Sequence, residues 1–219
     1  MSTLSALFKT MRPRQWTKNA FVFGALVFDR QLFIPQSFLC TLAGFVLFCL
    51  VSSAVYIFND LFDLESDRHH PEKRHRPLPS GKLSPRLALI AAFLLLVIAM
   101  SLGVLLSPTF SGVLVTYVVM MLAYSRWLKH IPILDVLTIA AGFVLRVHAG
   151  VTLIQVERFS PWLYVVTTLL ALYLGFGKRR AELAMLVENA TSHRRVLDGY
   201  TLKLLDQYIL LVSGTTIVA

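Results

Sequence analysis

Long apolar runs alternate with short charged segments along the whole chain. Five runs have about the 20 residues that an α-helix needs to span a bilayer, and they cover residues 37–58, 85–106, 110–128, 133–154 and 161–177. A shorter candidate covers 20–35, where Asp29, Arg30 and Gln31 interrupt the apolar residues, and a further run begins near Leu204. The pattern predicts an all-α, polytopic membrane protein with six full spans and the start of a seventh.

The composition agrees with this pattern. Hydrophobic residues make up 56% of the 219 positions and charged residues 15%, whereas soluble domains are about 45–50% apolar and about 25% charged. These values exclude a soluble globular domain, a disordered chain and a small disulfide-stapled module. Cys40 and Cys49 lie on opposite faces of one predicted span, about 13 Å apart along its axis, so they cannot form a disulfide with each other.

The basic residues report on membrane topology. Most of the 21 lysines and arginines precede the first predicted span or follow the second, fourth and sixth. If the spans alternate in direction, these segments share one side, which the positive-inside rule places in the cytoplasm. We therefore expect a protein of the plasma (inner) membrane, with its N-terminus and these loops cytoplasmic. The net charge of +9 then reflects topology, and nucleic acid is not an expected partner.

Three carboxylates follow the second predicted span. Asp60, Asp63 and Asp67 are spaced i, i+3 and i+7, which on a helix places them within about 60° of one another. These like charges repel, and carboxylates in or beside a membrane are costly and usually functional. A bound Mg²⁺ would relieve the repulsion, because Mg²⁺ takes hard oxygen ligands, commonly one or two carboxylates with water and phosphate oxygens. The alternative is a solvated acidic helix end.

A basic, proline-rich loop comes next. Lys73, Arg74 and Arg76 are candidates for phosphate binding, since ammonium and guanidinium groups suit phosphate oxygens. Lys82 and Arg86 are assigned to topology or to contact with lipid headgroups. The three histidines of this region lack tetrahedral zinc spacing and a cysteine partner, so zinc is not expected. The acidic cluster and the basic loop together predict a site for a Mg²⁺-diphosphate group.

The motifs resemble those of the UbiA-type prenyltransferase superfamily, helical membrane enzymes with two polar motifs on cytoplasmic loops. The first motif is Asn59-Asp60-x-x-Asp63-x-x-x-Asp67, followed by Arg-Pro-Leu-Pro-Ser-Gly at 76–81. Lys-Arg at 73–74, in place of a more common Arg-Thr, narrows the resemblance to the branch that uses phosphoribosyl diphosphate. So do the remaining motifs: Met-Arg-Pro-Arg-Gln-Trp-Thr-Lys-Asn at 11–19, Tyr124-Ser125-x-x-Leu128-Lys129-His130, Arg146-x-x-x-Gly150 and Gly-Lys-Arg-Arg-Ala-Glu-Leu at 177–183.

The resemblance implies one transmembrane catalytic domain over residues 1–219, built as a UbiA-like helical bundle. Nine spans are usual in that superfamily, so this chain is expected to be truncated within the seventh. The implied catalytic residues and Mg²⁺ ligands are Asp60, Asp63 and Asp67. The implied donor is phosphoribosyl diphosphate, and the implied acceptor is a polyprenyl phosphate within the membrane lipid. The product would serve the synthesis of the cell envelope. The resemblance leaves the oligomeric state open, with a homo-oligomer as one possibility. The implied substrate-binding residues are Lys18, Asn59, Lys73, Arg74, Arg76, Tyr124, Lys129, Asp135, Arg146, Lys178 and Arg179.

The second half of this site allows several interpretations. Only Asp135 follows Lys129, which argues against a second Mg²⁺ held wholly by carboxylates. Tyr124 fits an interfacial aromatic belt as well as a substrate contact, and Lys129 fits a cytoplasmic anchor as well as a phosphate ligand. Arg146 lies within an apolar span, where a charge must face protein, water or a ligand. Lys178 and Arg179 are spaced to pair with Glu182 on a helix surface or to reach the substrate.

Two other functions compete with phosphoribosyl transfer. In a prenyltransferase acting on an aromatic or lipid acceptor, the diphosphate belongs to the isoprenoid, and the fold and metal site would be the same. A sugar donor with a second phosphate at C5 needs more cations, for which Lys18, Lys129, Arg146 and Lys178 are candidates. A transporter or lipid-binding protein would bind its ligand without metal and without turnover.

Overall fold

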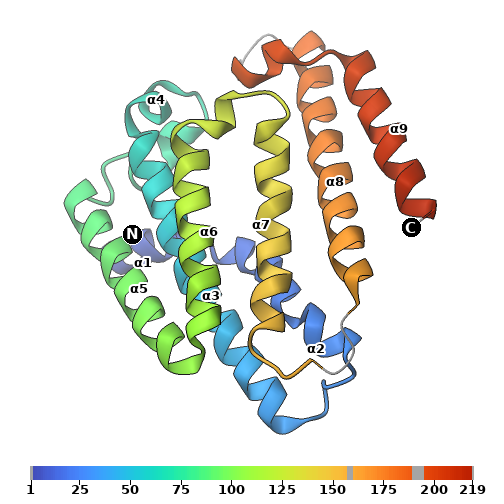
Figure 1. Cartoon of the computed structure of the whole chain (residues 1–219). Coiled ribbons are helices and arrows are strands. Elements are labelled where there is room, and N and C mark those ends of the chain that lie inside the picture. The colour runs from blue at the N-terminus through green and yellow to red at the C-terminus, as the bar shows by residue number, and fades with distance from the viewer. Residues whose placement is uncertain (1, 157–159, 189–194, 219) are drawn as a thin grey trace. The chain divides into compact units, whose positions relative to one another are not determined.

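The computed structural model describes residues 2–156, 160–188 and 195–218, which form helices and connecting loops without any strand (Figure 1). The α-helices are α1 (Thr3–Thr10), α2 (Gly24–Phe28), α3 (Pro35–Phe62), α4 (Leu64–His69), α5 (Pro85–Leu106), α6 (Pro108–Arg126), α7 (Leu134–Val151), α8 (Pro161–Glu188) and α9 (Leu202–Val218). An 11-residue 3₁₀ helix covers Pro13–Phe23, and shorter ones cover Lys73–His75, Leu128–His130 and Arg195–Gly199. The prediction of an all-α protein is confirmed.

Four of these helices, α3, α5, α6 and α7, are long and apolar enough to cross a membrane. They coincide, within a few residues, with the predicted spans at 37–58, 85–106, 110–128 and 133–154. Helix α8 includes the predicted span at 161–177 and continues to Glu188, and α9 begins two residues before the expected Leu204. The chain is a multi-pass membrane protein.

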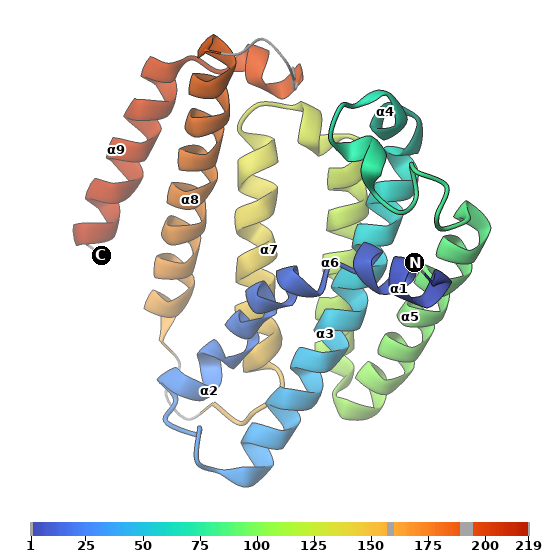
Figure 2. The ribbon, with the colours of Figure 1, turned by 180° about the vertical axis from the view of Figure 1, so that it is seen from behind.

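The first predicted span, at 20–35, differs from the structure. No single α-helix covers these residues, all of which are described; the 3₁₀ helix Pro13–Phe23 is followed by the five-residue α2. This segment lies antiparallel to α3 (Figure 2). Trp16 bonds to Ser53 near one end, and Gln31 bonds to Ser37 at the other. The segment therefore follows α3 over much of a bilayer thickness, but it begins earlier than predicted and carries polar residues.

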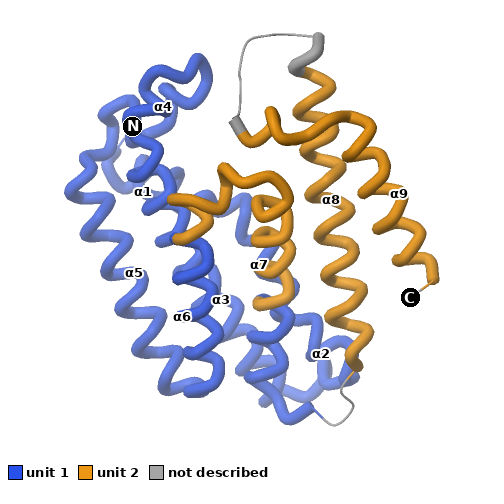
Figure 3. Tube along the Cα trace, turned by 45° about the horizontal axis from the view of Figure 1, so that its top comes forward, with its two compact units in different colours: residues 1–122, 146–157 blue, residues 123–145, 158–219 orange. Residues whose placement is uncertain are grey.

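The chain divides into two compact units, coloured separately in Figure 3. The first comprises Met1–Leu122 and Arg146–Glu157, and the second Ala123–Leu145 and Arg158–Ala219. In the second unit α8 packs against α9. Its core contains Val136, Phe176, Val196, Leu197, Tyr200, Leu205 and Val212.

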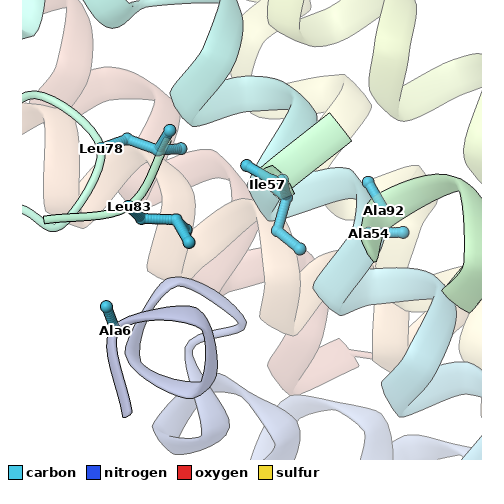
Figure 4. Packing of buried hydrophobic residues seen from close by; sticks show 7 residues of the cluster. Ala6, Ala54, Ile57, Leu78, Leu83 and Ala92 are labelled. Carbon is cyan, nitrogen blue, oxygen red and sulfur yellow. The ribbon is translucent and has the colours of Figure 1, made fainter. Parts of the chain in front are cut away.

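In the first unit, the principal packing partner of α3 is α5. Alanines at 54 and 92 lie in their shared core, where small side chains let two helices approach closely. Ala6 of α1 and two leucines of the basic loop, Leu78 and Leu83, complete this cluster (Figure 4). The buried leucines anchor the loop that carries the predicted phosphate-binding residues.

Gly150 explains one of the sequence motifs. A Cβ atom at Gly150 would lie 2.0 Å from the carbonyl oxygen of Val22. The last turns of α7 therefore pack directly against the backbone of the 3₁₀ helix, and only glycine permits this approach.

We predict that Gly150→Ala lowers the melting temperature, because the overpacking costs about 1–3 kcal/mol. The matched control is Gly112→Ala in α6, where an added Cβ meets nothing within 4 Å and helix propensity favours alanine. Thermal unfolding of the detergent-purified variants measures both effects. Equal melting temperatures for the two variants would contradict the close packing at Gly150.

Candidate active site

The acidic motif lies where one helix gives way to another. Helix α3 ends at Phe62 and α4 begins at Leu64, with Asp63 between them. The Asp63 N–H donates to the Asn59 carbonyl at 3.0 Å, and the Asp67 N–H donates to the Asp63 carbonyl at 2.8 Å. The three carboxylates are thus distributed over the end of one helix, a junction and a second helix. The expected single helical face is interrupted at Asp63.

Two of these carboxylates nevertheless converge on one arginine. The Nη1 atom of Arg76 lies 2.8 Å from Oδ2 of Asp67 and 3.5 Å from Oδ1 of Asp60. Asp60 and Asp67 are each only 2% exposed. Buried carboxylates are strongly disfavoured unless they are paired, so Arg76 compensates both.

Two further cations complete this cluster. Arg12 donates a hydrogen bond to Asp60, and its guanidinium lies 5.0 Å from the centre of the Tyr56 ring. Nζ of Lys73 lies 3.7 Å from Oδ1 of Asp67. Asp60, Asp67, Arg12, Lys73 and Arg76 are called the acid–base cluster below. It brings two of the three predicted metal ligands, Asp60 and Asp67, together with two predicted phosphate ligands, Lys73 and Arg76.

Local backbone contacts hold the basic loop in position. The Ser80 N–H donates to the Arg76 carbonyl and the Leu83 N–H to the Pro77 carbonyl, both at 3.0 Å. Gly81 has a φ of +76°, a conformation that favours glycine. These turns, with the buried leucines, fix the backbone that presents Arg76 to the carboxylates.

The other predicted site residues of these segments are Asn59, Asp63, Arg74 and Lys18. Asp63 is half-buried and accepts a hydrogen bond from the Asn59 side chain at 3.3 Å. Arg74 is exposed and its Nε atom lies 3.4 Å from Nε2 of His75, and Lys18 is also exposed. Of the three predicted loop ligands, Lys73 and Arg76 contact the carboxylates, while Arg74 contacts its neighbour.

The acid–base cluster fits a divalent cation in its chemistry. No group of three or more His, Cys, Asp or Glu side chains within the described part of the chain is close enough to hold a metal ion. However, Mg²⁺ usually takes only one or two carboxylates and fills its other positions with water and phosphate oxygens. Asp60 and Asp67 provide such a pair, and both bind the same Arg76 nitrogen.

Arg146 is buried elsewhere in the first unit. Its Nε donates to Oδ1 of Asn19 and its Nη2 to the Tyr117 hydroxyl, each at 2.8 Å. The guanidinium also lies 5.3 Å and 4.9 Å from the ring centres of Phe48 and Tyr117. With only 6% of its surface exposed, Arg146 is surrounded by protein groups.

Asp135 and Arg179 pair with each other in the second unit. Arg179 donates to Asp135 at 2.6 Å and to Glu182 at 2.6 Å. Tyr200 donates to the other Asp135 oxygen at 2.6 Å and accepts from the Ile133 N–H. Burial, and then the hydrogen bond to Asp135, raise the pKa of the Tyr200 hydroxyl. This network joins three segments of the chain, at 133–135, 179–182 and 200, and supports the second core.

The remaining predicted ligands of the second unit are more accessible. The Lys178 ammonium is 3.9 Å from Glu182, with 71% of its side chain exposed. Tyr124 and Lys129 are half-buried at the end of α6 and in the following 3₁₀ turn. The helix-surface pairing that the sequence allowed for Lys178 and Arg179 is present, and the Arg179 pair is buried.

Four residues of these networks were absent from the predicted site. Arg12 and Asn19 belong to the N-terminal motif, which could have indicated them. Tyr117 lies inside an apolar span and Tyr200 far along the chain from Asp135, so no local pattern could have found either.

Comparison with known proteins identifies the family. The UbiA prenyltransferase family matches residues 20–177. The chain belongs to this family. It is 33% identical to the decaprenyl-phosphate phosphoribosyltransferase of Mycolicibacterium smegmatis, over 98% of this chain and 68% of that protein. The corresponding Mycobacterium tuberculosis H37Rv protein is 32% identical, over 98% and 72%. The UbiA-family chain is therefore an enzyme.

Solved structures show the same fold. A UbiA homologue from Archaeoglobus fulgidus, bound to DMAPP and Mg²⁺, has a TM-score of 0.78 at 18% identity, covering 97% of this chain and 75% of that one. The same homologue has also been solved with Cd²⁺. The prediction of a UbiA-like bundle is confirmed.

We predict that Tyr200→Phe destabilises the second unit by about 1–3 kcal/mol, because it leaves a buried Asp135 oxygen without its donor. Tyr208→Phe is the control, since it keeps the ring that packs against Phe176, with the ring centres 5.0 Å apart. Denaturant unfolding in detergent compares the two. A Tyr200→Phe variant as stable as the control would show that the hydroxyl contributes little.

Proposed function

We propose that this enzyme transfers a 5-phosphoribosyl group from phosphoribosyl diphosphate to a long-chain polyprenyl phosphate and releases diphosphate. The observation that carries the proposal is the acid–base cluster, in which two buried carboxylates lie beside three cations. A metal–diphosphate group needs both: carboxylates for the metal and cations for the phosphate oxygens. The names of the two mycobacterial relatives support the identity of donor and acceptor.

Asp60 and Asp67 would hold Mg²⁺, with Asp63 as the third predicted ligand. The ion supplies neutralisation of the charge that develops on the leaving diphosphate. Arg76 and Lys73 are close enough to the carboxylates to bind the phosphate oxygens of the same group. We assign Arg12 to this role as well, because it already contacts Asp60.

The reaction breaks the bond between C1 of the ribose and the diphosphate oxygen. A phosphate oxygen of the acceptor forms the new bond to C1, and diphosphate leaves with the electron pair. Because the acceptor phosphate is already ionised, the site needs no strong general base. Arg12, Lys73 and Arg76 then act by positioning the donor and by stabilising the leaving group.

The 5-phosphate of the donor requires cations outside the acid–base cluster. Lys18, Lys129 and Lys178 are the candidates, and 71% of the Lys178 side chain is exposed. Arg74 is exposed in the basic loop and is available to either phosphate group. Arg146 and Arg179 are buried against protein groups, and Asn59 and Tyr124 are proposed as neutral contacts.

The acceptor and the orientation follow from the membrane. Helix α5 exposes many large apolar side chains, including Leu89, Phe93 and Val97, which is expected where lipid or a polyprenyl tail lies against it. We propose that the end of α3 carrying the acid–base cluster faces the cytoplasm of the plasma membrane. Its basic residues obey the positive-inside rule, and the donor is soluble in water.

We predict that Asp60→Asn and Asp67→Asn lower turnover by about a hundredfold or more, and that EDTA abolishes it. Glu65→Gln is the matched control, because Glu65 lies on α4 beside Asp67 but is exposed and pairs only locally with Arg68. Transfer of labelled ribose 5-phosphate into lipid measures the rate.

Two results would contradict this proposal. Full activity in EDTA would remove the metal from the mechanism. Consumption of a prenyl diphosphate with an aromatic acceptor, and no use of phosphoribosyl diphosphate, would favour the prenyltransferase alternative.

A further inference from the structure

We infer that Arg146 is a positioning residue, which acts through Asn19 and the 3₁₀ helix Pro13–Phe23 to hold Arg12 against Asp60. The inference deepens the proposed function and rests on it in one respect: Asp60 is taken to belong to the donor site. All of these residues lie in the first unit.

The surroundings of Arg146 favour a role inside the protein. Arg146 donates hydrogen bonds to Asn19 and to Tyr117, both 2.8 Å long. Two aromatic rings lie near its planar group, where a cation is attracted to the ring face. A phosphate ligand would need an exposed edge of the guanidinium, and Arg146 is almost completely buried.

The segment that Arg146 holds depends on such support. It forms 11 residues of 3₁₀ helix, whereas runs beyond three or four residues are uncommon because their hydrogen-bond geometry is poor. It begins after Arg12, whose φ of 54° lies in the left-handed region, which is rare for residues other than glycine. Such backbone persists only where the surrounding contacts over-determine it.

Three side chains bind this segment to α3 at successive positions along the helix. Arg12 contacts Asp60. Trp16 donates from Nε1 to the Ser53 hydroxyl at 3.0 Å. Asn19 then donates from Nδ2 to the Ser52 hydroxyl, also at 3.0 Å.

Asn19 also connects this helix to α7. Its amide oxygen accepts from Arg146 while its amide nitrogen donates to Ser52 of α3. One turn further along α7, Gly150 packs against the Val22 carbonyl. Arg146 and Gly150 thus form one contact face on α7, and contact with the 3₁₀ helix Pro13–Phe23 explains the Arg146-x-x-x-Gly150 motif.

Loss of the Arg146–Asn19 hydrogen bond would also change the acid–base cluster. If Arg146 releases Asn19, the 3₁₀ helix loses the charged hydrogen bond that joins it to α7, and the strained backbone at Arg12, just before the helix, is free to relax. Arg12 would then leave Asp60, and the donor site would lose a cation. Arg146 therefore affects donor binding without contacting the donor.

Hydrogen exchange tests the structural part of this inference independently of activity. In Arg146→Lys, which keeps the charge but loses the forked geometry, we expect amides of residues 13–23 to exchange about tenfold faster. Tyr117→Phe is a milder variant, because it keeps the ring and removes the hydroxyl. Ser37→Ala is the control. It removes a hydrogen bond to Gln31, which lies between α2 and the start of α3, and should leave exchange at residues 13–23 unchanged.

A double-mutant cycle tests the path to the donor. Arg12→Gln and Arg146→Lys should each raise the donor KM about tenfold, and the double variant should be no worse than Arg12→Gln alone, because both act through one contact. Multiplied effects in the double variant, or unchanged exchange at residues 13–23, would overturn the inference. Faster exchange in a chain that uses no phosphoribosyl donor would instead refute the proposed function and leave the positioning role in place.

Discussion

The compensation of two buried carboxylates is the constraint on which the rest of the first unit depends. Asp60 and Asp67 are shielded from water at the end of a membrane helix, where an unpaired charge is costly. Arg76 contacts both, and Arg12 and Lys73 each contact one of them. The two carboxylates come from different helices and the cations from the N-terminal segment and the basic loop. One electrostatic requirement therefore joins four parts of the chain.

Under the proposed function, the same cations would serve a second state. In the described structure they neutralise the carboxylates directly, whereas a metal–diphosphate group would take the carboxylates onto the metal and the cations onto phosphate. Exchanging one set of partners for the other would give every buried ion a partner of opposite charge in both states. The loop that carries Arg76 is anchored by Leu78 and Leu83, which keeps the cation in place for both states.

The sequence predicted the apolar helices and the two motifs because these features are local. Helices α3, α5, α6 and α7 follow apolar runs, and the motif spacing located Asp60 and Asp67. The first predicted span was misplaced because the 3₁₀ helix Pro13–Phe23 carries polar residues. Two side chains of this helix, Trp16 and Asn19, donate hydrogen bonds to serines of α3. The pairing of Asp135 with Arg179 and Tyr200 joins residues 44 and 65 positions apart, and no periodicity reveals such contacts. The contacts of Arg146 with Asn19 and Tyr117 also join residues far apart in the sequence, so they could not be predicted from it.

Binding of labelled phosphoribosyl diphosphate to the purified chain, with and without Mg²⁺, tests most directly whether the acid–base cluster is the donor site. We predict binding that requires Mg²⁺, is displaced by free diphosphate, and is weakened about tenfold or more by Arg76→Gln. Lys82→Gln, an exposed substitution in the same loop, should bind like the unaltered chain. Binding that persists in EDTA, or an equal loss in the two variants, would contradict the account.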